Sequence, residues 1–212
     1  MSDIVLDVQS ASATPAAGQI VIFPETGGKR LTFKDDAGRT YTLGEGCIRN
    51  QSNAVSGAGF AVDTYVAGSN ITVPASLTLQ VGSQYRCKIS LSKTAAGVAT
   101  PICNVRVGTL GTTADAAMFT FTGAIQTAAA DVGFIEVLFT VNTIGATGTM
   151  RGTYVLKHNV ASGAGLSGTD IIEQGNGSFN TTTASLIIGI SLNFGTAASV
   201  ITTQVEAELL NI

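Results

Sequence analysis

Short runs in which apolar and polar residues alternate recur along this chain, and they constrain its fold more than any other feature. In residues 85–92, YRCKISLS, the residues Tyr85, Cys87, Ile89 and Leu91 fall on one side of an extended backbone and polar residues fall on the other. Strand side chains alternate with a period of two, so such a run predicts a strand with one buried side. No sustained period of 3.6 residues competes with this pattern. The sequence therefore predicts an all-β protein.

The larger part of the chain contains eight runs of this kind, separated by residues typical of turns. They cover residues 77–81, 85–92, 102–107, 118–122, 134–141, 150–158, 186–194 and 200–209. Eight antiparallel strands of this length suit two packed sheets, and we expect an antiparallel jelly-roll sandwich. An immunoglobulin-like sandwich is the rival, but a core Trp is typical of that fold and this chain has no Trp.

Residues 186–194, LIIGISLNF, predict a central strand of the sandwich. Leu and Ile residues such as Ile190 share one side of this strand, whereas Gly189, Ser191 and Asn193 occupy the other. A glycine inside a strand often marks a place where another element approaches closely. We therefore expect a close neighbour beside Gly189, and we expect Ser191 and Asn193 to face solvent or another subunit.

A separate hairpin is predicted before the sandwich. Residues 31–43, LTFKDDAGRTYTL, indicate two short strands joined by the turn DDAG, in which Gly38 can adopt a positive φ. A hairpin of this size is not stable alone, so it must dock on the main domain, on another copy or on another protein. The predicted organisation is an N-terminal attachment segment with a β-hairpin, a polar linker and a jelly-roll domain, at residues 1–44, 45–60 and 61–212.

The chain is poor in charge. Hydrophobic residues make up 45% and charged residues 12% of its 212 residues, whereas about 25% charged residues is typical of soluble proteins. Large exposed apolar patches mark sites of interaction, so we expect part of the apolar and hydroxyl-rich surface to be buried against other copies of the chain. The net charge is −3 and the Lys and Arg residues are scattered. This distribution argues against nucleic acid as a partner, because phosphate binding requires concentrated positive charge.

Neither a secretory signal nor a membrane span is predicted. The N-terminal sequence MSDIVLDVQS has no basic segment followed by an apolar one. No apolar run approaches the ~20 residues that cross a bilayer. The protein is expected to be made and folded in a cytoplasm, without contact with a membrane.

The thiols are expected to be structural, and the imidazole is expected to be either structural or solvated. The chain has three cysteines, Cys47, Cys87 and Cys103, and no two of them form a C-x-x-C pair, so all three are predicted to be reduced. Cys87 and Cys103 lie in predicted strands, where Cys behaves as a small hydrophobic residue. His158 is the only histidine, and it ends a strand run with no catalytic or metal-binding motif around it. No metal site is predicted.

The carboxylates are the remaining candidates for catalytic residues. Two positioned carboxylates suffice to hydrolyse a glycosidic bond, but Asp35 and Asp36 lie in the predicted turn, where Asp is favoured for ordinary reasons. Glu206 and Glu208 share one side of the last strand and are expected to face solvent or an interface. We expect no enzyme activity, no catalytic residues and no cofactor. Residues 159–185 are expected to be a long loop, either a contact surface or a disordered surface loop.

Two segments resemble known proteins. Residues 15–46, PAAGQIVIFPETGGKRLTFKDDAGRTYTLGEG, resemble the N-terminal segment of phage tail-fibre and head-fibre proteins. The matching residues are Gly28, Lys29, Leu31, Phe33, Lys34, Asp35, Asp36 and Gly38. Residues 105–123, VRVGTLGTTADAAMFTFTG, with the runs around FIEVLFTVN and MRGTYVLKHN, resemble the trimeric jelly-roll domains of phage fibres and capsid-decorating proteins.

The resemblance implies a structural protein of a tailed-phage virion, a homotrimer that docks on capsid or tail proteins through its N-terminal segment. Its expected place is the virion surface, first as a capsid decoration (cement) or head-fibre protein, which the short chain favours. One alternative is a short tail-fibre or baseplate protein that binds a host receptor or surface glycan. A further alternative is a bacterial carbohydrate-binding module, against which the 6% aromatic content without Trp counts.

Overall fold

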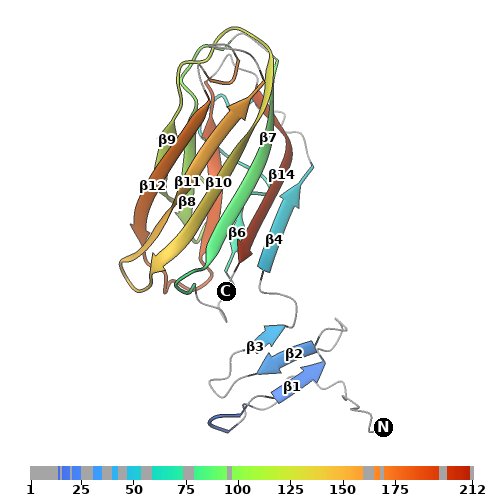
Figure 1. The fold of residues 1–212 in the computed structure, drawn as a ribbon, viewed down its shortest axis with the longest axis vertical. Helices are drawn as coiled ribbons and strands as arrows, with labels where there is room; N and C mark the ends of the chain where they lie inside the picture. Colours follow the sequence, from blue (N-terminus) through green and yellow to red (C-terminus); the bar gives the residue numbers. More distant parts are fainter. Residues whose placement is uncertain are drawn as a thin grey trace. The chain divides into compact units, whose positions relative to one another are not determined.

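The chain folds into β-structure throughout its regular elements (Figure 1). The computed structural model describes residues 14, 16–19, 21–24, 31–34, 40–42, 47–53, 59–73, 79–94, 97–159, 165–167, 170–195 and 200–210. Two compact units divide the chain, Met1–Cys47 and Ile48–Ile212. The prediction of an all-β protein is confirmed.

The first unit contains one small antiparallel sheet. Its strands are β1 (Val21–Pro24), β2 (Leu31–Lys34) and β3 (Thr40–Thr42), in the order β1-β2-β3. Phe33 of β2 pairs with Tyr41 of β3, as the predicted hairpin requires. The predicted turn at residues 35–38 lies outside the described residues.

The second unit contains two antiparallel sheets. We call the first the large sheet; in spatial order its strands are β12 (Ile171–Phe179), β11 (Gly148–His158), β10 (Asp131–Thr143), β7 (Gln84–Lys93), β14 (Val200–Leu210) and β4 (Cys47–Ser52). We call the second the small sheet; β5 (Thr64–Tyr65) and β6 (Ile71–Thr72) both pair with β13 (Ile187–Asn193), which is followed by β8 (Ile102–Gly108) and β9 (Ala116–Thr122).

The two sheets form a β-sandwich, as predicted. The finer prediction of a jelly roll is not specifically confirmed by the strand order. The consecutive strands β10, β11 and β12 lie side by side in the large sheet, and β8 and β9 form a hairpin in the small one. A jelly roll builds its two sheets from interlocked Greek keys instead.

The core lies between the sheets and is rich in stacked aromatic rings. The ring of Phe119 in β9 stacks on that of Phe139 in β10 with 4.3 Å between centroids, and Phe121 stacks on Tyr154 in β11 at 4.5 Å. Aromatic pairs of this kind contribute about 0.5–1.5 kcal/mol beyond the burial of their area. These contacts join the small sheet to the large one across the core.

Strong alternation predicted strands reliably. Seven of the eight predicted runs have a counterpart, namely β7, β8, β9, β10, β11, β13 and β14. The alternating residues of 85–92 behave as expected, because Tyr85 and Ile89 are fully buried whereas Arg86 and Lys88 are exposed. The exception is the run 77–81, whose described residues 79–81 form no strand.

Two segments predicted to lack strands contain one each. Within the predicted linker 45–60, β4 forms the edge of the large sheet, and Asn50 fixes it by donating a hydrogen bond of 2.7 Å to the backbone oxygen of Asn70. Within the predicted loop 159–185, β12 forms the opposite edge. The linker and loop predictions were therefore wrong for these residues.

Glycines explain why β12 can be a strand despite its weak pattern. A Cβ atom at Gly175 would lie 2.7 Å from a ring carbon of Phe119, and one at Gly177 would lie 2.4 Å from the side chain of Met118. Both contacts are shorter than real Cβ atoms make. The absence of side chains therefore allows β12 of the large sheet to approach β9 of the small sheet and to close one side of the sandwich.

The central strand β13 has the predicted close neighbour. A Cβ atom at Gly189 would lie 2.0 Å from the hydroxyl oxygen of Tyr65, and Ile190 on the other side is fully buried. The expectation that Ser191 faces solvent or another subunit is wrong, because Ser191 is 0% exposed within the chain. Its hydroxyl accepts a hydrogen bond from Arg106 that covers it.

Candidate functional site

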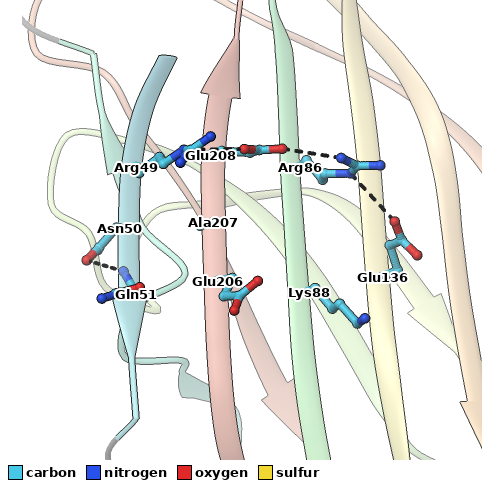
Figure 2. Close-up of a pocket in the computed structure, with 9 residues that line it drawn as sticks. All are labelled: Arg49, Asn50, Gln51, Arg86, Lys88, Glu136, Glu206, Ala207 and Glu208. Carbon is cyan, nitrogen blue, oxygen red and sulfur yellow. Dashed lines mark hydrogen bonds and ion pairs between the residues drawn. The ribbon is translucent and has the colours of Figure 1, made fainter. Parts of the chain in front are cut away.

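A polar groove of about 540 Å³ lies on the outer face of the large sheet. Its side chains come from four neighbouring strands, β4, β14, β7 and β10, which the antiparallel pairing places side by side (Figure 2). We call it the charged groove; it is lined by Arg49, Asn50, Gln51, Arg86, Lys88, Glu136, Glu206, Ala207 and Glu208.

Ion pairs connect these strands in a row. Glu208 on β14 contacts Arg49 on β4 at 3.6 Å and Arg86 on β7 at 3.3 Å. Arg86 also reaches Glu136 on β10 at 3.6 Å, as Figure 2 shows. Exposed ion pairs each contribute only about 0–1 kcal/mol, so the row adds little stability. Its consequence is geometric, because each charged group is held in position by a partner of opposite sign.

The charges that line the groove cancel. Arg49, Arg86 and Lys88 supply three positive groups, and three glutamates supply the negative ones. Guanidinium groups only donate hydrogen bonds and carboxylates only accept them. The groove therefore presents alternating donors and acceptors without net charge, an arrangement that can bind a polar, uncharged ligand but has no preference for anions.

The sequence predicted only part of this groove. Glu206 and Glu208 share the solvent-facing side of β14, where Glu206 is exposed and Glu208 is half-buried. Arg49, Arg86 and Glu136 were missed as its other members. They lie on strands far apart in the sequence, and only the register that places Glu208 opposite Arg86 brings them together.

A second hollow of about 620 Å³ adjoins the charged groove on the same sheet face and shares Lys88 with it. The ammonium group of Lys88 lies over the ring of Phe134, 5.3 Å from its centroid. Such a contact contributes about 0.5–1 kcal/mol at an exposed site. It fixes the position of Lys88 between the two hollows.

His158 has a buried side chain and serves the packing of one end of the sandwich. Its Nδ1 atom lies 2.9 Å from a carboxylate oxygen of Asp131, within ion-pairing distance but without the alignment of a hydrogen bond. The same carboxylate accepts a hydrogen bond of 2.9 Å from the backbone of Leu166. This geometry supports the predicted structural role of His158.

A buried ammonium group organises the loops beside His158. Lys93 donates hydrogen bonds to the backbone oxygens of Gly97 at 2.7 Å and Gly165 at 3.1 Å, and also to that of Thr127. Burial lowers the pKa of Lys93, and the nearby Asp131 carboxylate opposes this effect. One side chain thus connects three loops that are distant in the sequence.

The cysteines occupy the positions expected of them. Cys87 and Cys103 are buried in the core and Cys47 is partly exposed on β4. Burial raises the pKa of the Cys87 thiol to about 12 and raises that of Cys103 as well. Asp35 and Asp36 lie outside the described residues.

The described part of the chain contains neither a metal centre nor a membrane-spanning helix. Within it, no group of three or more His, Cys, Asp or Glu side chains is arranged to hold a metal ion. Among the same residues, no helix is long and apolar enough to cross a membrane.

Comparison with known proteins finds a likeness at the level of structure. No family model matches the chain, and no curated protein matches it. Among solved structures, the chain is similar to the CBM2 module of the evolved Dit protein from Lactobacillus casei BL23 phage J-1. The identity is 9% and the TM-score 0.32, over 79% of this chain and 91% of that one. A likeness this distant carries no argument about function.

Proposed function

We propose that this chain is a non-enzymatic structural protein on the surface of a tailed-phage particle. The observation that carries the proposal is the division of the chain at Cys47 into a small unit and a β-sandwich. The described strands of the small unit have three or four residues each, and a sheet built from such strands gains little stability by itself. A partner surface would supply the missing burial, and the resemblance of residues 15–46 to phage fibre proteins favours a particle protein as that partner.

The groove chemistry supports a binding or assembly role rather than catalysis. The carboxylates of Glu136 and Glu208 are both engaged by Arg86, and His158 is enclosed in the sandwich. A general acid or base must reach a proton of its substrate. These groups are instead committed to partners within the protein.

The finer form of the proposal is a capsid decoration (cement) or head-fibre protein that forms a homotrimer. The alternative is a short tail-fibre or baseplate protein. Electron microscopy of particles labelled with an antibody against the sandwich distinguishes them, because the label lies on the head in one case and on the tail in the other. Particles without any label would refute the proposal in both forms.

Attachment through the small unit is tested by truncation. A chain that starts at Cys47 retains β4 and should keep the β-sheet spectrum of the full chain. We expect it to have lost binding to particles that lack this protein, whereas the full chain binds them in the same sedimentation assay. Equal binding by the two chains would place attachment in the sandwich.

A carbohydrate-binding module is the second candidate, and the charged groove is the observation that favours it. Paired Arg and Glu side chains can bind sugar hydroxyls, which both donate and accept hydrogen bonds. A glycan array with the full chain tests this function. Binding that is lost in Arg86→Ala and kept in Arg151→Ala, a variant on the same sheet outside the charged groove, would support it.

A further inference from the structure

The two outer faces of the sandwich differ in their charge. Charged side chains point outward from five strands of the large sheet; they are Arg49, Arg86, Lys88, Glu136, Arg151, Lys157, Glu206 and Glu208. Their exposure is substantial, for example 77% for the side chain of Arg49 and 48% for that of Arg86. This face is solvated as the charged surface of a soluble protein would be.

On the outer side of the small sheet, the charged side chains are largely shielded from solvent. Among the described residues there, the charged ones are Asp63, Arg106 and Asp115. The guanidinium group of Arg106 is 10% exposed, forms an ion pair with Asp63 and donates a hydrogen bond of 2.5 Å to the backbone oxygen of Asp115. These groups therefore satisfy one another.

Asp115 is occupied in the same manner. Its carboxylate accepts backbone hydrogen bonds from Thr109, Leu110 and Gly111, at 3.1, 3.1 and 2.6 Å. The residue is 6% exposed and closes the loop between β8 and β9. The charges of Asp115 and Arg106 thus hold the fold together and are not presented to water.

What this side of the sandwich presents is small and uncharged. Ala117, Thr120 and Thr122 on β9 are exposed, and their partners on β8 are Arg106, Asn104 and Ile102. Two exposed apolar side chains belong to adjoining loops, Val62 at 66% and Leu110 at 63% exposure. We call this surface the neutral face, defined by Val62, Leu110, Ala117, Thr120 and Thr122.

We propose that the neutral face is the surface through which copies of this chain associate. Covering it removes no unpaired ion from water, whereas covering the outer face of the large sheet would desolvate eight charged side chains, a large cost. In a homotrimer each copy would place part of its neutral face against the next copy around the three-fold axis, and this contact would bring together no unpaired charges.

This inference rests on the proposed self-association and names the surface responsible for it. The test measures the mass of the full chain by light scattering. Ala117→Arg and Thr120→Arg each place a charge on the neutral face, at exposed positions that a long side chain can occupy without disturbing the core. We expect the wild type to have a multimer mass and both variants to have the monomer mass at the same concentration.

Gln174→Arg and Gln204→Arg are the matched controls. Both residues are exposed on the outer face of the large sheet, and they should keep the multimer mass. Melting temperatures within a few degrees of the wild type show that each variant is folded. A monomeric wild type would overturn both the proposed self-association and this interface.

Other results would overturn the interface alone. A multimeric wild type whose mass is unchanged in Ala117→Arg and Thr120→Arg would place the contact elsewhere. Dissociation by the control variants, alone or together with the others, would show that the neutral face has no special part in assembly. Particle attachment by the small unit is unaffected by either result.

Discussion

The hydroxyl of Ser191 accepts a hydrogen bond of 2.7 Å from the Nε atom of Arg106, and both residues are buried on the side of the small sheet that points away from the core. The sandwich thus has a second buried layer, made of polar groups, outside its apolar one. Thr120 is itself exposed and borders this layer, because its hydroxyl donates a hydrogen bond of 2.8 Å to the side-chain oxygen of Asn104. Asp63 and the backbone of Asp115 contact Arg106 and complete the polar contacts of this layer.

The polar layer changes the stability expected of variants in β13. Ile190→Ala removes a fully buried side chain and should cost about 2–5 kcal/mol of unfolding free energy. Ser191→Ala leaves the Nε–H group of Arg106 without its acceptor and should cost about 1–3 kcal/mol. Denaturant unfolding measures both, with exposed Thr122→Ala as a control that should change by less than about 0.5 kcal/mol. An unchanged unfolding free energy in Ser191→Ala would show that the contact with Arg106 does not stabilise the fold.

A lysine should not be able to replace Arg106 without loss of stability. The guanidinium group contacts Ser191, Asp63 and the backbone of Asp115 at the same time, and a single ammonium group cannot reproduce this fork. We expect Arg106→Lys and Arg106→Leu each to lower the unfolding free energy by about 3 kcal/mol. Full stability of Arg106→Lys would contradict the geometry. A double-mutant cycle with Asp63→Asn isolates the ion pair.

Local alternation was sufficient to predict the strands that carry the core. In β7, period two identifies Tyr85 and Ile89 as buried and Arg86 as exposed without any knowledge of the neighbouring strands. By contrast, β12 reads IIEQGNGSF and lies within residues 159–185, which were expected to be a loop; it contains two glycines, Gly175 and Gly177. They are required by the approach of β9, which no local pattern reveals. Strands of two residues, such as β5, are too short to show any period.

The candidate site depended on pairing between strands and so escaped prediction. Arg49 and Glu208 are at opposite ends of the sequence, and their contact requires β4 to lie beside β14. The same holds for the burial of Ser191, because the cover of its face comes from Arg106 on a different strand. Alternation indicates which side of a strand a residue occupies, but whether the outer side is covered depends on the rest of the fold.

The hydroxyl of Tyr65 has no hydrogen-bond partner among the described residues although the atom is buried. Tyr65→Phe should therefore leave the unfolding free energy unchanged or raise it, by up to about 1 kcal/mol. Gly189→Ala should lower it by about 1–3 kcal/mol, because the new Cβ atom would lie 2.0 Å from the hydroxyl oxygen. In a Tyr65→Ala background this cost should shrink. Equal costs in both backgrounds would locate the clash elsewhere.

The Cys87 thiol should make the protein less stable in alkali. Burial raises its pKa from 9.0 to about 12, an effect that a hydrogen bond with Tyr85 partly offsets. Between these values the unfolded chain loses the thiol proton while the folded chain keeps it. The contribution of this thiol to the unfolding free energy is therefore complete below pH 9 and lost as the pH approaches 12. Because each unit of pKa shift corresponds to about 1.4 kcal/mol, the unfolding free energy should fall by about 4 kcal/mol over this range.

The comparison of variants isolates this contribution. Burial lowers the pKa of Lys93, so that residue acts in the opposite direction, and burial raises the pKa of Cys103 and Tyr85, which act in the same direction. Cys87→Ala should have a lower unfolding free energy than the wild type at neutral pH, because it leaves a cavity, but a shallower decline between pH 9 and 11. Cys47→Ala, partly exposed on β4, should decline in parallel with the wild type. A decline of Cys87→Ala as steep as that of the wild type would mean that the thiol ionises equally in both states and that its burial has no effect on its proton.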